Sequence, residues 1–128
     1  MIATTTKAKR HVLLLDDSPL VLQVTREALE AAGYQVSVAK DLAEFEGQRG
    51  DVDLILIDVQ MPEAFGDDLA GVLRGVHGVA TPIYLFSMLD EADLAEKARA
   101  AEIDGYISKR AGIQALVGRV HTILGAQG

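Results

Sequence analysis

Residues 11–20 read HVLLLDDSPL, and this stretch decides the fold. The run His11–Leu15 has the length and composition of a buried strand, and Asp16-Asp17 ends it. Ser18-Pro19 then begins a helix, because serine is a favoured N-cap and proline at the first helical position lacks only an N–H that has no partner there. A strand that leads directly into a helix is the repeating unit of α/β folds.

The same strand–helix alternation continues along the chain. The periodicity predicts further strands at Gln35–Ala39, Asp53–Ile57, Ile83–Phe86 and Gly105–Ser108. It predicts helices from Pro19 to Gly33, from Asp41 (with Glu44 as a capping box) to about Arg49, from about Asp67 to Gly75, from an Asp90 cap to about Glu102, and from Ile113 to Leu124. Short connections imply a parallel sheet between two layers of helices. Right-handed crossovers leave few strand orders, and we predict the order 2-1-3-4-5 of a flavodoxin-like, three-layer (βα)5 fold.

Composition excludes several classes of function. The 128 residues suit one domain, and 49% hydrophobic residues suffice for a core. No apolar run reaches the roughly 18 residues of a membrane span, so we expect a cytoplasmic protein without a membrane partner. The absence of cysteine excludes disulfides and thiolate catalysis. The net charge of -7 argues against direct nucleic-acid binding, which needs clustered Lys and Arg.

Polar side chains follow four of the predicted strands, at the point where each strand ends. They are Asp16-Asp17, Asp58, Ser87 and Lys109. Because the carboxyl ends of parallel strands meet at one edge of the sheet, where open α/β sheets bind ligands, we expect these groups to form one site. A single aspartate after a strand is usually a helix cap, but Ser18 already caps the first helix.

The three predicted site carboxylates would repel one another, and a divalent cation would remove that conflict. Oxygen ligands without His or Cys suit Mg²⁺. We therefore predict Asp17 and Asp58 as direct Mg²⁺ ligands and Asp16 as a ligand through a bound water. The backbone carbonyl of Gln60 would complete the set.

The chain resembles the receiver domain of bacterial two-component response regulators, with single-domain chemotaxis regulators closest in layout. The residues that carry the resemblance are Asp16-Asp17, Asp58, Met61-Pro62, Gly66, Ser87, Tyr106 and Lys109. The resemblance implies that a histidine kinase or phosphotransfer protein phosphorylates Asp58 and that Mg²⁺ is required. It implies a signalling domain and not an enzyme, although the domain assists its own phosphorylation and dephosphorylation. The receiver domain is expected at residues 11–128, after a flexible arm at residues 1–10.

The resemblance also implies a switch. Lys109 would offset charge on the phosphoryl oxygens, and the Ser87 hydroxyl would donate a hydrogen bond to one of them. The loop after the fourth strand would move inward, and Tyr106 would rotate into the vacated space. The face formed by the fourth helix, fifth strand and last helix would then dock differently on an unknown protein target. We expect a monomer or a phosphorylation-dependent dimer.

Two residues depart from the family pattern, and Gln60 and Leu89 occupy positions that flank the site and tune hydrolysis in the family. Arg110 stands where the family commonly has proline, and Met88 stands where a small residue is usual. Leu89 is apolar and cannot orient an attacking water, so we predict a persistent acyl phosphate. Phe65 is expected to be exposed for a partner, and the three histidines are interpreted as surface or structural residues.

We favour a receiver domain that stands alone, because only Gly125–Gly128 follow the last predicted helix. Two alternatives stay open. The first is a pseudo-receiver docking module that never uses phosphate, as Arg110 and Met88 would suit. The second is a phosphohydrolase of the haloacid dehalogenase type. That family has a second aspartate two residues after its nucleophile, and residue 18 is serine here.

Overall fold

Five parallel strands form the centre of the structure, a computed structural model that describes residues 9–48, 50–62 and 65–125. The spatial order is β2-β1-β3-β4-β5, as predicted. The strands are β1 (His11–Leu15), β2 (Gln35–Ala39), β3 (Leu54–Ile57), β4 (Ile83–Ser87) and β5 (Gly105–Ser108). The helices are α1 (Pro19–Ala31), α2 (Leu42–Gln48), α3 (Gly66–Gly75), α4 (Glu91–Ala101), the 3-10 turn η1 (Lys109–Ala111) and α5 (Ile113–Gly125). The predicted end of the second helix at Arg49 and most of the predicted arm lie outside the described residues.

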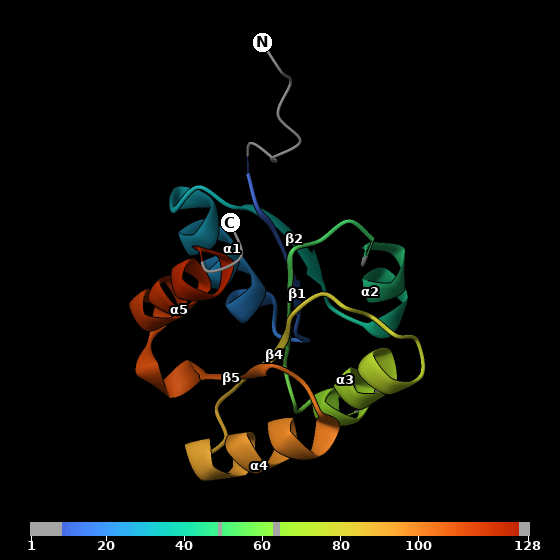
Figure 1. Ribbon diagram of the computed structural model, residues 1–128. Helices are drawn as coiled ribbons and strands as arrows, with labels where there is room; N and C mark the ends of the chain where they lie inside the picture. The colour runs from blue at the N-terminus through green and yellow to red at the C-terminus, as the bar shows by residue number, and fades with distance from the viewer. Residues whose placement is uncertain (1–8, 49, 63–64, 126–128) are drawn as a thin grey trace.

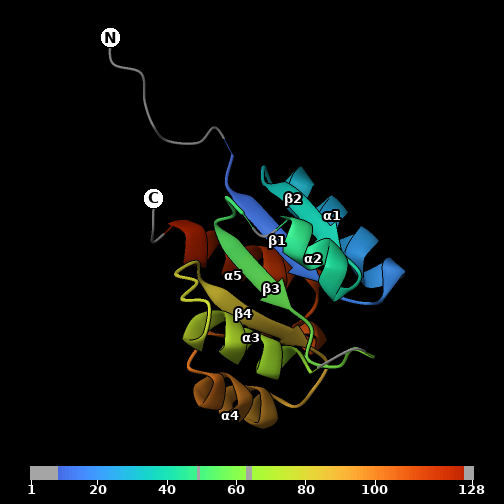
Figure 2. The ribbon, with the colours of Figure 1, turned by 90° about the vertical axis from the view of Figure 1, so that its right-hand side faces the viewer.

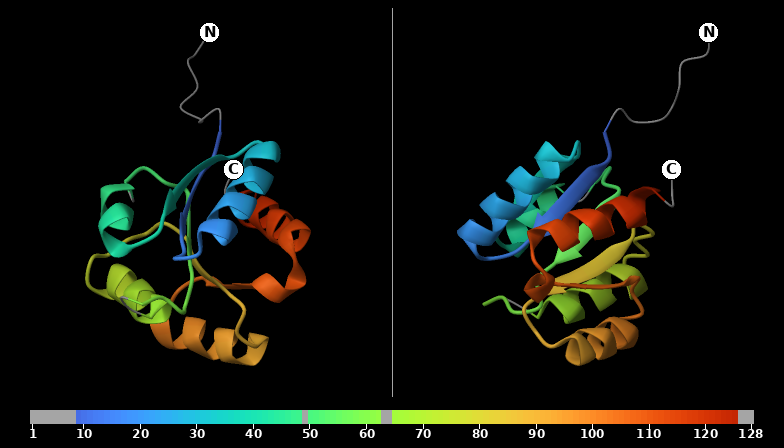
Figure 3. Two further views of the ribbon diagram at one scale, coloured as in Figure 1. Left: turned by 180° about the vertical axis from the view of Figure 1, so that it is seen from behind. Right: turned by 90° about the vertical axis from the view of Figure 1, so that its left-hand side faces the viewer.

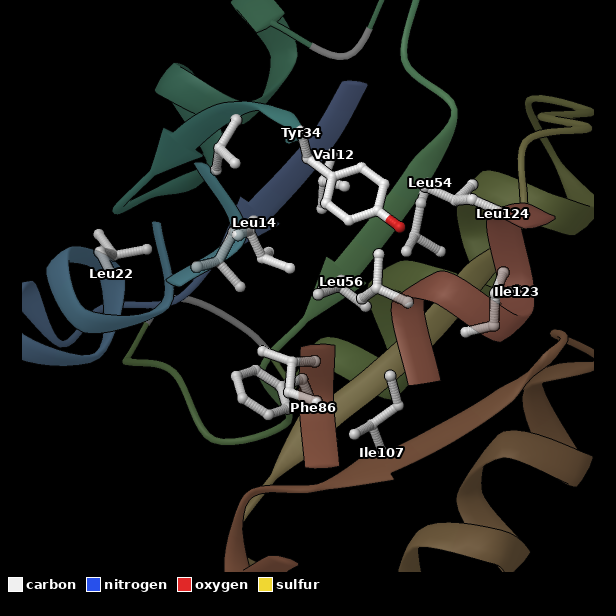
Figure 4. Packing of buried hydrophobic residues seen from close by; sticks show 14 residues of the cluster. Val12, Leu14, Leu22, Tyr34, Leu54, Leu56, Phe86, Ile107, Ile123 and Leu124 are labelled. Carbon is white, nitrogen blue, oxygen red and sulfur yellow. The ribbon is translucent and has the colours of Figure 1, made fainter. Parts of the chain in front are cut away.

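Helices cover both faces of the sheet, with α1 and α5 on one face and α2, α3 and α4 on the other (Figures 1 and 2). Alternate residues of each central strand point to opposite faces, so each strand contributes to two cores. Leu14 and Leu56 pack with α1 and α5, in the cluster that Figure 4 shows. Leu15 and Ile57 pack with the opposite helices. Strand β3 is buried throughout and β1 is buried from Val12 to Leu15, which explains why these sequences are continuous apolar runs. No helix in the described residues is both long and apolar enough to cross a membrane.

The strand register brings the polar strand ends to one level. Leu15 of β1 pairs with Ile57 of β3, and the Asp58 amide donates to the Leu15 carbonyl at 2.9 Å. The residues that follow, Asp16 and Asp58, therefore lie side by side. Ser87 of β4 pairs with Ser108, the last residue of β5.

The predicted Ser18 cap forms, and the predicted capping box of Asp41 and Glu44 forms in part. The Ser18 hydroxyl accepts the Val21 amide at 3.3 Å. Asp41 Oδ1 accepts the Glu44 amide at 2.9 Å, while Glu44 Oε1 accepts the Lys40 amide one residue before the cap, also at 2.9 Å.

The predicted cap of α4 needs a correction. Asp90 occupies the N-cap position, but its side chain accepts no capping hydrogen bond. Its carboxylate instead lies 2.9 Å from Arg110 Nη1.

The histidines have the surface and structural surroundings predicted for them. His11 Nε2 lies 2.7 Å from Ser37 Oγ, within hydrogen-bonding distance. His121 of α5 shares a hydrogen bond with the Tyr34 hydroxyl, and His77 is exposed after α3.

Candidate functional site

Three carboxylates converge at the carboxyl edge of the sheet. One oxygen each from Asp16, Asp17 and Asp58 lies within 4.8 Å of the other two. Asp16 and Asp58 are 1% and 6% exposed, whereas Asp17 is open to solvent. Asp16 Oδ1 accepts the Ser18 amide at 2.9 Å, which fixes that carboxylate at the entrance to α1. The predicted convergence is confirmed, and the open side at Asp17 leaves room for an approaching group.

Lys109 supplies positive charge to this cluster. Its Nζ donates to Asp16 Oδ2 at 2.6 Å and lies 3.5 Å from Asp58 Oδ1. The ammonium also lies 5.3 Å from the centroid of the Phe86 ring. A single ammonium cannot neutralise three carboxylates, so the site keeps an excess of negative charge.

That excess matters most at Asp58. Burial raises the pKa of Asp58 from 3.8 to about 6, and the neighbouring Asp16 charge adds to the rise. Lys109 and the Gln60 backbone N–H act in the opposite direction without cancelling it. The ionised carboxylate is therefore held in an unfavourable environment, which a further cation would relieve. An all-oxygen donor set with this charge fits Mg²⁺.

The loop after Asp58 depends on a close backbone approach at Gly66. The Gly66 amide donates to the Val59 carbonyl at 2.8 Å, and Gln60 forms an antiparallel bridge with Phe65. A Cβ added at Gly66 would lie 1.9 Å from the Asp58 carbonyl oxygen, so only glycine fits there. The sequence shows a glycine at position 66, but it does not show that this residue packs against the Asp58 backbone carbonyl. The carbonyl of Gln60 as a metal ligand stays a prediction.

Ser87 and Tyr106 lie on the two neighbouring strands beyond Asp58. Ser87 is fully buried at the end of β4, and its Oγ accepts the Leu89 amide at 3.3 Å. Tyr106 is half-buried on β5, and its hydroxyl donates to Glu91 Oε1 at 3.4 Å in the first turn of α4. Ser87 thus joins the edge that holds the carboxylates, and Tyr106 faces the helix after Ser87.

The surroundings of the cluster include surface that sequence reasoning did not identify. Beside Lys109 lies an apolar groove of about 350 Å³, lined in part by Leu20, Val24, Met88 and Ile113. Leu20 is 68% exposed and Met88 is 53% exposed. Phe65, directly before α3, is 61% exposed, as expected.

Sequence reasoning also missed the contacts of Arg110. Its Nε donates to the Met88 carbonyl at 2.6 Å, and Nη1 pairs with Asp90. No local pattern signals these contacts, because they join separate loops.

Comparison with known proteins places the chain in a family. The family model of the response regulator receiver domain matches residues 12–121. The chain is 32% identical over 117 residues to the cell cycle transcriptional regulator CtrA of Caulobacter vibrioides, covering 89% of this chain and 50% of that protein. It is 37% identical over 106 residues to the gliding motility regulatory protein of Myxococcus xanthus, covering 80% of this chain and 14% of that one. The chain spans half or less of the length of these two relatives.

Solved structures agree. The receiver domain of the Francisella response regulator 1452 superposes with a TM-score of 0.83 at 28% identity, covering 94% of this chain and 100% of that one. The Vibrio cholerae chemotaxis protein CheY4 gives a TM-score of 0.77 at 26% identity, covering 91% and 99%.

Receiver domains are signalling domains that interact with histidine kinases or phosphotransfer proteins, and phosphorylation on an aspartate is general among them. They generally bind Mg²⁺ at a cluster of aspartates such as the one described above. The resemblance read from the strand ends is thus confirmed, and this chain belongs to the family of response regulator receiver domains.

Proposed function

We propose that this domain accepts a phosphoryl group on Asp58 from a phosphohistidine of a kinase or phosphotransfer protein. The observation that carries the proposal is the placement of Asp58. Its carboxylate is nearly buried, 3.5 Å from the Lys109 ammonium and within 4.8 Å of two further carboxylates. Neither a helix cap nor a surface ion pair needs such an arrangement.

In the proposed transfer, an Asp58 oxygen attacks phosphorus in line with the P–N bond of the donor. That bond breaks, and the electron pair stays on the imidazole nitrogen, which then takes a proton. Lys109 offsets negative charge on the transferred oxygens. The residues that would hold Mg²⁺ are Asp16, Asp17 and Asp58, with the Gln60 carbonyl. When bound, the ion neutralises phosphoryl charge and favours the ionised Asp58.

The proposed output is a change in docking of the α4–β5–α5 face. The buried Ser87 hydroxyl turns from the Leu89 amide toward a phosphoryl oxygen, and the loop between β4 and α4 follows it. Tyr106 then leaves Glu91 and occupies the vacated space. The phosphoryl group shifts the populations of two arrangements that both exist beforehand. A stand-alone role in the cell stays a prediction.

Hydrolysis of the acyl phosphate is proposed to be slow. Leu89 is half-buried against the core cluster on the side of α3 and α4, so it adds an apolar group beside the site and no hydrogen-bonding group for water. The expected lifetime in the purified protein is well beyond seconds.

The test is incubation with a small phosphodonor and Mg²⁺, followed by intact mass. The wild type should gain one phosphoryl group, and Asp58→Asn should gain none. Asp68→Asn, which removes an exposed carboxylate of α3, is the matched control and should behave as the wild type. An unmodified wild type would favour the docking module without phosphate, and modification that persists in Asp58→Asn would disprove the assigned position.

A further inference from the structure

We propose that Arg110 is a latch that holds the loop between β4 and α4 in its unphosphorylated position and so opposes phosphorylation of Asp58. The inference rests on the proposed function. Arg110 is a positioning residue that acts through the loop, because its guanidinium contacts neither Asp58 nor its carboxylate neighbours in the described contacts.

The latch consists of two contacts from one guanidinium. Arg110 Nε donates to the Met88 carbonyl at 2.6 Å, and Nη1 lies 2.9 Å from Asp90 Oδ1. Met88 and Asp90 flank Leu89, so the planar guanidinium spans the whole connection from the end of β4 to the start of α4. Figure 3 shows the orange turn after β5 beside this connection in both views.

The latch joins the loop to the same turn that places the site ammonium. Lys109 and Arg110 are neighbours in η1, and this turn is fixed by the Arg110 amide, which donates to Ser108 Oγ at 3.1 Å. Lys109 points to the carboxylates, whereas Arg110 points to the loop. The turn η1 therefore contacts both the carboxylate cluster and the loop between β4 and α4.

Movement of Ser87 toward a phosphoryl group must disturb the latch. Met88 follows Ser87 directly, so its carbonyl cannot keep a 2.6 Å bond to Arg110 while the loop moves inward and η1 stays in place. The Arg110 contacts thus stabilise only the unphosphorylated arrangement of the loop. Phosphorylation must break them, so they make phosphorylation less favourable.

Asp90 gives the loop a second stable arrangement. It lies at the N-cap of α4 with extended backbone, yet its side chain makes no cap bond because Arg110 holds it. Once released, this carboxylate can cap α4, which aspartate does well. The Arg110 and Asp90 side chains are 57% and 68% exposed, so the ion pair contributes little and the latch is weak enough to open.

The experiment compares wild type with Arg110→Ala in two measurements. The first is amide hydrogen exchange of residues 86–94 without phosphodonor, which should become faster in the variant and stay unchanged elsewhere. The second is the affinity for beryllofluoride with Mg²⁺, a probe that takes the place of the phosphoryl group. We expect it to rise about fivefold, the factor that corresponds to about 1 kcal/mol.

Two further variants sharpen the comparison. Asp90→Asn keeps a capping residue but removes the ion pair, and it should shift the affinity in the same direction by a smaller factor. Arg99→Ala is the control, because Arg99 is an exposed arginine of α4 whose guanidinium pairs with Glu96 on the same helix. Melting curves should show all of these variants folded.

The outcomes separate the latch from the proposed function. Unchanged exchange, unchanged affinity or weaker beryllofluoride binding in Arg110→Ala would each overturn the latch, while wild-type binding would leave the proposed function standing. A wild type that binds no beryllofluoride and takes up no phosphoryl group would defeat the proposed function, and the latch with it.

Discussion

Replacing Asp58 with asparagine should stabilise the metal-free protein at neutral pH. The wild-type carboxylate is nearly buried beside Asp16, and its pKa is raised from 3.8 to about 6. A rise of this size corresponds to about 3 kcal/mol against the ionised form. Because Asp17 leaves the site open to solvent and asparagine loses the attraction of Lys109, we expect Asp58→Asn to gain about 1–2 kcal/mol in the free energy of unfolding.

The gain in the free energy of unfolding of Asp58→Asn should grow as pH rises. A raised pKa means that folded Asp58 binds a proton more readily than in the unfolded chain. The stabilisation from that proton is complete below about pH 4 and is lost as pH rises through about 6. Wild type and Asp58→Asn should therefore be nearly equal in stability near pH 4 and differ fully by about pH 7.5.

The assay is urea unfolding in EDTA across this pH range, followed by circular dichroism, with unchanged m-values as a check on two-state behaviour. Mg²⁺ should then stabilise the wild type more than the variant, because it binds the folded carboxylate cluster. Asp68→Asn should keep the wild-type pH profile. A less stable Asp58→Asn at about pH 7.5, or a difference that persists to about pH 4, would refute the account of a strained buried carboxylate.

Three further predictions concern the surroundings of Asp58. Gly66→Ala should lose several kcal/mol of stability or displace Asp58, because the new Cβ would lie 1.9 Å from the Asp58 carbonyl oxygen. Gly47→Ala is the control, because a Cβ at this position of α2 meets open space, and it should gain about 0.5–1 kcal/mol. Equal urea midpoints for the two variants would contradict the packing argument. Lys109→Met should slow phosphorylation at least tenfold and raise the pKa of Asp58 further, since the ammonium 3.5 Å from Asp58 is lost. The rate is measured by intact mass against time. Phosphorylation at the wild-type rate would exclude the role assigned to Lys109. Leu89→Asn should shorten the acyl-phosphate lifetime severalfold by adding a group that binds water, measured as loss of the adduct after removal of donor; an unchanged lifetime would show that Leu89 does not limit hydrolysis.

Local pattern accounts for what could be predicted of this chain. The runs Val12–Leu15 and Leu54–Ile57 are apolar throughout, which identifies central parallel strands without knowledge of their partners. The carboxyl ends of such strands share one edge, so Asp16, Asp17 and Asp58 had to converge. The handedness of the connections left few possible strand orders, and the flavodoxin-like order that we chose among them is the one in the structure.

What the sequence determined by itself is therefore the set of elements, a small number of possible strand orders and the edge that carries the site, because hydrophobic period and chain chirality act over short distances along the chain. Only the tertiary structure decided which groups touch. Lys109 donates a hydrogen bond to Asp16, which lies 93 positions away in the sequence. The Asp90 carboxylate, which the local pattern predicts as the cap of α4, instead forms an ion pair with Arg110. Such contacts depend on the path of the loops, and the raised pKa of Asp58 depends on burial by residues from several strands, so neither is encoded in any single segment.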